Sequence, residues 1–173
     1  MAAVQRLQQG LRALTAFARP VDRDRAAAYL SPPLLACFDA MRRSEQQHSL
    51  NVLAELEAEG PVTVDLAVAA LLHDAGKSRY PFPTWQKTMV VLVRAFLPRR
   101  FARLSQGSEH DRIARPFVIS QQHPAWSASL AEQAGASSRA VWLIAHHADP
   151  PDQWTSHPDA PLLARLRAAD DHN

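Results

Sequence analysis

The sequence is poor in cysteine and glycine, and it has no long uncharged apolar run. The single cysteine, Cys37, excludes an internal disulfide and offers no thiolate cluster for a structural zinc ion. No apolar stretch approaches the roughly 20 residues that a bilayer-spanning helix needs, and Arg6 and Arg12 interrupt the N-terminal pattern that a signal peptide would show. We therefore expect a cytoplasmic protein.

The sequence also lacks a large excess of either positive or negative charge. The chain carries 19 Lys or Arg and 17 Asp or Glu, a formal net charge of +2 in spite of a sequence pI near 9.1. This mixed surface predicts no stable binding of nucleic acid. With 173 residues, the chain can form one domain with its own core, and its excess of Ala, Leu, Arg and Gln over 5 Gly favours helices.

Apolar spacing and capping residues predict a helical bundle without strands. In the first half of the chain, helices are expected over residues 2–18, from Ser31 to about Arg43, from a Ser44 cap to Gly60, and over 64–74 with Gly76 as the end. In the second half, they are expected over 84–104 with a break at Pro98, over 124–133, from Ser137 or Ser138 to His146–His147, and around Asp170. Residues 116–122 are left unassigned. We expect one all-α domain over 1–173, with helices of 1–43 packed on it and an inserted apolar and basic segment at 78–117.

Histidines and aspartates fall one or two to a predicted helix, at or near its ends. They are His48, His73, Asp74, His123, His146, His147 and Asp170. Imidazole and carboxylate together bind divalent metals, and helices that each offer one inward ligand can build such a site in a bundle core. The spacing leaves open which of the adjacent residues His146 and His147 faces the metal.

The ordered set resembles the HD-domain (HDIG-type) metal-dependent phosphohydrolases, whose signature is His, then His-Asp, then a distant Asp on a helical bundle. The matching stretches are QQHSLNVL, LLHDAGK and LRAADD, and QQHPAW and IAHHAD match the two further histidines of dinuclear members. The resemblance covers about residues 44–171. It implies one ion on His48, His73, Asp74 and Asp170 and a second on His123 and His146 or His147, with Asp74 bridging.

Lys77 follows Asp74 by three residues, so a continuing helical turn would keep its ammonium near the metals and on a phosphate oxygen. We expect Asp74 and Lys77 to be catalytic. The expected cofactors are two divalent ions, with Mn or Fe foremost and Mg, Co, Ni or Zn as alternatives. The sequence differs from some members of this family at two positions. The Gly-Tyr-Pro motif of the cyclic di-GMP phosphodiesterase branch is missing after His147, and Ser44 stands where some members have a Glu for a third metal.

The inserted segment combines an apolar run, Met89 to Val93, with Lys87, Arg94, Arg99, Arg100 and Arg103. Three interpretations of residues 85–104 stay open: a cover for the bundle or a homodimer contact, an interfacial helix on an anionic membrane surface, and a lid that brings arginines to the substrate. The second would place the protein at the inner membrane surface.

We expect a hydrolase, either a phosphatase or a phosphodiesterase, that acts on a nucleotide or another small phosphorylated metabolite through a metal-activated water. The alternative is a non-catalytic module that senses a nucleotide or signals at a membrane on the same scaffold.

Overall fold

The computed structural model describes residues 20–80 and 82–173, so the helix predicted over 2–18 lies outside the described residues. Within them the secondary structure is helical and contains no strand, as predicted. The elements are α2 (Arg23–Ala27), α3 (Pro32–Asp39), α4 (Arg43–Glu59), α5 (Val64–Leu72), the 3₁₀ helix η1 (Ala75–Arg79), α6 (Thr84–Phe96), α7 (Pro98–Ser105), α8 (Arg115–Gln133), α9 (Ser138–His146) and α10 (Ala160–His172).

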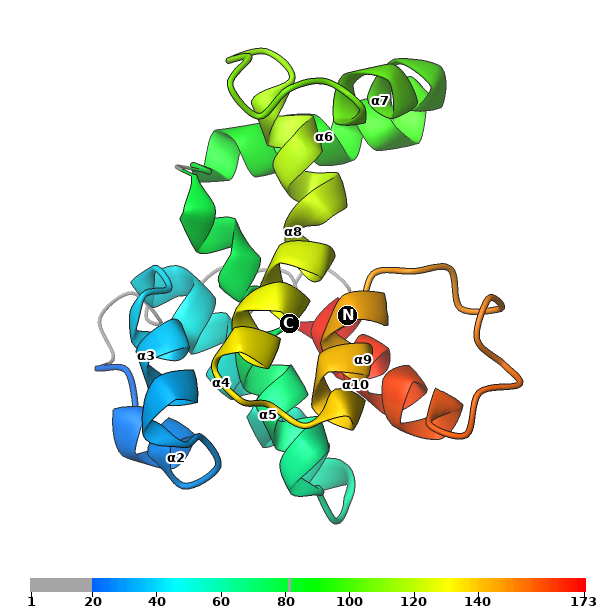
Figure 1. Cartoon of the computed structure of the whole chain (residues 1–173). Helices are drawn as coiled ribbons and strands as arrows, with labels where there is room; N and C mark the ends of the chain where they lie inside the picture. The colour runs from blue at the N-terminus through cyan, green and yellow to red at the C-terminus, as the bar shows by residue number, and fades with distance from the viewer. Residues whose placement is uncertain (1–19, 81) are drawn as a thin grey trace, which may run out of the picture.

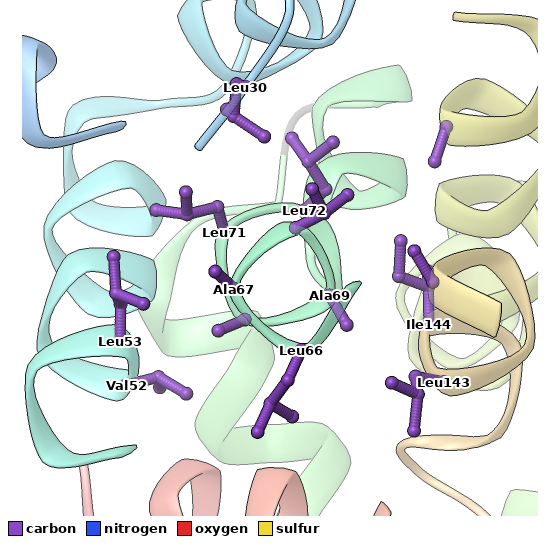
Figure 2. Packing of buried hydrophobic residues seen from close by; sticks show 14 of the residues in the cluster. Leu30, Val52, Leu53, Leu66, Ala67, Ala69, Leu71, Leu72, Leu143 and Ile144 are labelled. Carbon is purple, nitrogen blue, oxygen red and sulfur yellow. The ribbon is translucent and has the colours of Figure 1, made fainter. Parts of the chain in front are cut away.

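Helix α5 forms the centre of the main core. Its residues from Leu66 to Leu72 are all buried, because the sequence is apolar on every side of the helix. Viewed along α5, side chains from α4 lie on one side and Leu143 and Ile144 of α9 on the other (Figure 2). Helices α3 and α10 also contact α5. The end of α5 is therefore held in place by packing from several directions.

A second, smaller core lies under α6 and α7. Its buried residues are Phe82, Val90, Phe101, Phe117 and Ile119. Figure 1 shows α6 and α7 beside the first turns of α8, at one end of the molecule and away from α5. Helix α8 runs from this small core into the main core, so it connects the two regions. No helix of the described residues is long and apolar enough to span a membrane.

Several helix limits differ from the sequence prediction. Helix α3 ends at Asp39 and not near Arg43, and α4 begins at Arg43 with Arg42 as its N-cap and not Ser44. The unassigned residues 116–122 form the first half of α8, which continues through Pro124. The prediction that a helix starts at Pro124 was wrong because Pro116 already occupies the first turn of this helix.

Gly76 does not end α5, which stops at Leu72 with His73 as its C-cap. It lies inside η1, against α8. A Cβ atom at residue 76 would lie 2.5 Å from the carbonyl oxygen of His123 and 2.8 Å from the amide nitrogen of Ser127. Only glycine lets the two backbones approach so closely, and the Gly76 N–H donates to Ser127 Oγ at 2.8 Å. The glycine thus fixes η1 against α8, next to the predicted ligands.

Candidate metal centre

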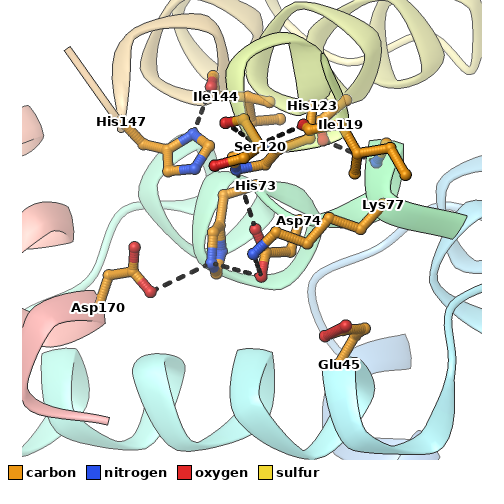
Figure 3. Close-up of polar contacts among 12 residues, drawn as sticks. Glu45, His73, Asp74, Lys77, Ile119, Ser120, His123, Ile144, His147 and Asp170 are labelled. Carbon is orange, nitrogen blue, oxygen red and sulfur yellow. Dashed lines mark hydrogen bonds and ion pairs between the residues drawn. The ribbon is translucent and has the colours of Figure 1, made fainter. Parts of the chain in front are cut away.

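Six of the predicted ligands converge from five helices. His48 comes from α4, His73 and Asp74 from the end of α5, His123 from α8, His147 from the end of α9 and Asp170 from α10. Their ligand atoms form three overlapping groups, each within 4.8 Å: His48, His73 and Asp74; His73, His147 and Asp170; and Asp74, His123 and His147. Figure 3 shows five of these side chains converging from different helices: His73, Asp74, His123, His147 and Asp170.

Backbone carbonyls fix the ring orientation of three histidines. His73 Nδ1 lies 2.9 Å from the Ala70 oxygen, and His147 Nδ1 lies 2.7 Å from the Ile144 oxygen. His123 Nδ1 lies 3.0 Å from the Ser120 oxygen. A carbonyl only accepts, so Nδ1 carries a proton in each ring and Nε2 points into the cluster. This is the arrangement by which proteins orient metal-binding histidines.

Pro124 contributes to the orientation of His123. A proline in a helix has no N–H for the carbonyl four residues earlier, which here belongs to Ser120. That oxygen is therefore left for the His123 ring, whose Nδ1 lies 3.0 Å away. Pro124, which was predicted to start a helix, instead lies inside α8 and helps to orient a ligand.

At the centre of the cluster, imidazole nitrogens and carboxylate oxygens face one another with few hydrogen bonds between them. His73 Nε2 is fully buried and makes no hydrogen bond to any described residue. It faces Asp170 Oδ1 at 3.4 Å and Asp74 Oδ2 at 3.7 Å, and His123 Nε2 faces Asp74 Oδ1 at 3.4 Å. Lone pairs directed at one another repel unless a cation lies between them. A mixed set of imidazole nitrogens and carboxylate oxygens of this kind fits a divalent metal.

The pKa values indicate that both carboxylates of the cluster are ionised. Burial would raise the pKa of Asp74, but Lys77 and the surrounding histidines lower it well below its usual range. Burial likewise opposes the charged form of Asp170, yet the hydrogen bond with His48 and the nearby His73 ring lower its pKa. Burial lowers the pKa of His123 to about 3 and that of His147 to about 4, so both rings are neutral at pH 7 and available as ligands.

Two hydrogen-bonded contacts satisfy part of this carboxylate pair. Lys77 Nζ lies 2.6 Å from Asp74 Oδ2, because one turn of η1 brings residues 74 and 77 to the same side. Burial works against the ammonium, but the carboxylate outweighs it and raises the pKa of Lys77. His48 Nε2 lies at hydrogen-bond distance, 2.8 Å, from Asp170 Oδ1. Asp74 therefore directs one oxygen to Lys77, His48 and His73 and the other to His123.

His146 lies outside the cluster, so its place among the predicted ligands is corrected. Its Nδ1 lies 2.7 Å from Asp149 Oδ2, and its ring contacts Trp142 and Trp154. Adjacent helical residues diverge by about 100°, so only one of the pair can face inward. The structure places His147 there, 5 % exposed.

Glu45 and Lys87 lie close to the cluster, although the sequence pattern predicted no role for either residue at the site. The Glu45 carboxylate is buried on α4, three residues before His48, and forms a short contact with Lys87 Nζ on α6. It also raises the pKa of Lys77, after the larger effects of burial and Asp74. Its position three residues before His48 puts it on the same side of α4, which could have been recognised. Figure 3 shows Glu45 below Lys77.

The arginines expected of a lid do not join the cluster. Arg94 donates to Ser120 Oγ and stacks on Phe101, while Arg99, Arg100 and Arg103 are exposed on α7. The cation that α6 directs toward the site is Lys87.

A family model for the HD domain matches residues 46–172, which is most of the chain and contains all six clustered ligands. The chain belongs to the HD-domain family of metal-dependent phosphohydrolases. No curated protein and no solved structure matches the chain. HD domains bind divalent metals, and the six converging ligands of this HD domain form a centre that could hold them.

Proposed function

We propose that this HD-domain protein hydrolyses a phosphate ester or phosphodiester of a nucleotide or another small phosphorylated metabolite. The observation that carries the proposal is the buried His73 Nε2, which has no hydrogen bond and is directed at two carboxylates. Residues His48, His73, Asp74 and Asp170 would hold one ion. His123 and His147 would hold a second, and Asp74 would bridge the two.

Divalent ions bound there would polarise a phosphoryl oxygen and bring the pKa of a coordinated water close to neutrality. The protein's own contribution is positioning and charge. Lys77 keeps its proton at neutral pH and is a fifth exposed, so its ammonium can pair with a phosphate oxygen at the edge of the cluster. For His123 and His147, the lowered pKa values and the Nδ1 contacts with carbonyls leave Nε2 unprotonated at neutral pH, so a metal can bind there without proton loss.

A substrate screen tests the proposal. Protein loaded with Mn²⁺ or Fe²⁺ is assayed for release of phosphate or a nucleoside monophosphate from monoesters, nucleotides, dinucleoside polyphosphates and cyclic dinucleotides. We expect turnover of at least one class, lost in His73→Ala and retained in His146→Ala, which removes a neighbouring imidazole outside the cluster. Lys77→Gln should reduce kcat on the order of 100-fold with metal content unchanged. Binding of a nucleotide with no turnover under any metal would favour the non-catalytic sensing module.

A further inference from the structure

Helix α6 has an apolar side that no described residue covers. We call it the α6 outer face and define it by Trp85, Val91, Leu92 and Phe96, whose exposed fractions are 65 %, 65 %, 51 % and 77 %. The opposite side of α6 packs Val90 into the small core. Large apolar side chains scattered singly are common on protein surfaces, but four gathered on one side of one helix indicate a contact surface.

The charge around this face has one sign. Residues 80–107 contain five Lys or Arg and no Asp or Glu, a net charge of +5, whereas the rest of the chain has 14 Lys or Arg and 17 Asp or Glu, a net charge of −3. The +5 segment contains α6 and α7, which lie side by side at one end of the molecule (Figure 1). Apolar and basic groups are therefore concentrated in the same part of the surface.

Three of the five cations are available to a partner. Lys87 is bound to Glu45, and Arg94 to Ser120 and Phe101. Arg99, Arg100 and Arg103 are exposed on α7, and no ion pair joins them to another described residue. Helix α7 buries Phe101 on its inner side, so these arginines face away from the small core.

We propose that the α6 outer face, together with Arg99, Arg100 and Arg103, docks on the surface of an anionic lipid bilayer. Apolar side chains with Trp and Phe insert at the boundary of headgroups and acyl chains, and arginines beside them pair with lipid phosphates. The docking surface is separate from the metal centre, so the proposal stands independently of the chemistry proposed for that centre.

Charge argues against the two other possible occupants. A symmetric dimer through this face would place the +5 segment of one copy against that of the other. Residues 1–19 contain Arg6, Arg12 and Arg19 and no acid, so they would also bring positive charge to a positive surface. An anionic bilayer is the partner that matches both the apolar and the basic character.

Vesicle flotation of the full chain tests the proposal. The vesicles contain phosphatidylcholine alone or with 30 % phosphatidylserine (about a third of the lipid as anion), at low and high salt. We expect binding to the anionic vesicles that weakens as salt rises. Leu92→Ser with Phe96→Ser should abolish it, and Arg99→Gln with Arg100→Gln and Arg103→Gln should weaken it on the order of 100-fold. Both sets alter exposed residues, and far-UV circular dichroism verifies that they fold.

Val64→Ser is the matched control, because Val64 is 62 % exposed at the start of α5, away from α6, and its loss should leave binding unchanged. A blue shift of tryptophan emission on binding should vanish in Trp85→Phe. The proposal is overturned if the chain stays unbound at low salt, or if either set of variants floats like the wild type. A concentration-dependent dimer that Leu92→Ser with Phe96→Ser abolishes, without any lipid binding, would assign the face to a second copy.

Discussion

The bundle around α5 and the α6–α7 region differ in what their apolar residues do. In the bundle, Leu66 and Leu71 are fully buried, and the helices that cover α5 also carry the metal ligands. In the α6–α7 region five buried residues form the core, while the apolar side chains of the α6 outer face remain exposed. Packing in the bundle holds the site rigidly, whereas the α6–α7 region buries only part of its apolar surface when the chain folds. The predictions below test this difference.

The largest effect should come from truncating a buried leucine. Leu66→Ala removes a fully buried side chain of α5 and should lower the free energy of unfolding by about 2–5 kcal/mol. Leu92→Ala, at a position 51 % exposed, should change it by less than about 0.5 kcal/mol. Urea unfolding of the metal-free protein measures both. Equal losses would mean that the α6 outer face is already buried in solution.

Substitution of the adjacent residues His146 and His147 should affect metal affinity very differently, because only His147 lies in the cluster. His147→Ala removes a buried Nε2 from the cluster and should weaken metal binding about 100-fold, or roughly 2.7 kcal/mol. His146→Ala breaks only the contact with Asp149 and should change metal affinity less than about threefold. Competition titration with a metal chelator compares them. The reverse order would place the wrong histidine in the centre.

Pro124→Ala should act oppositely on stability and on metal binding. The new N–H can donate to the Ser120 carbonyl, so α8 should gain about 1–3 kcal/mol. The His123 ring then competes for the oxygen that its Nδ1 contacts at 3.0 Å, and metal affinity should fall about tenfold. Thermal unfolding and metal titration provide the two readouts. Unchanged metal affinity would show that Pro124 has no part in orienting His123.

The smallest effect should appear where the two regions meet. Lys87→Met leaves the buried Glu45 carboxylate without its partner and should cost about 1 kcal/mol, less than for a fully buried pair because Lys87 is a third exposed. A double-mutant cycle with Glu45→Gln isolates the pair. Additive effects of the two substitutions would mean that this contact does not couple α6 to the bundle.

The sequence predicted the structure best where a local pattern, such as apolar periodicity or the order of the ligand residues, decides it. The all-round apolar character of Leu66 to Leu72 predicted a central helix, and the order of His48, His73, Asp74, His123 and Asp170 predicted that these residues meet. It was less informative where tertiary contacts decide. Pro124 normally indicates a helix end, yet packing on both sides keeps α8 continuous. Gly76 serves a close approach to α8 that no local signal reveals.

Glu45 shows the same limit at the site. Its burial and its contact with Lys87 depend on where the inserted helix α6 packs, which the spacing of residues along the chain does not determine. The choice between His146 and His147 likewise depends on the rotation of α9 about its axis, which packing against α8, α5 and α10 fixes.

The central claim is that the cluster around Asp74 is a metal centre that supports hydrolysis. Metal content and turnover of the wild type and of Asp74→Asn, a substitution of nearly equal size, test it directly. We predict about two equivalents of divalent metal per wild-type chain, and a loss of metal and of at least about 1000-fold in kcat in the variant at unchanged helicity. A wild type whose turnover survives complete metal removal, or an Asp74→Asn protein with full metal and activity, would contradict the account.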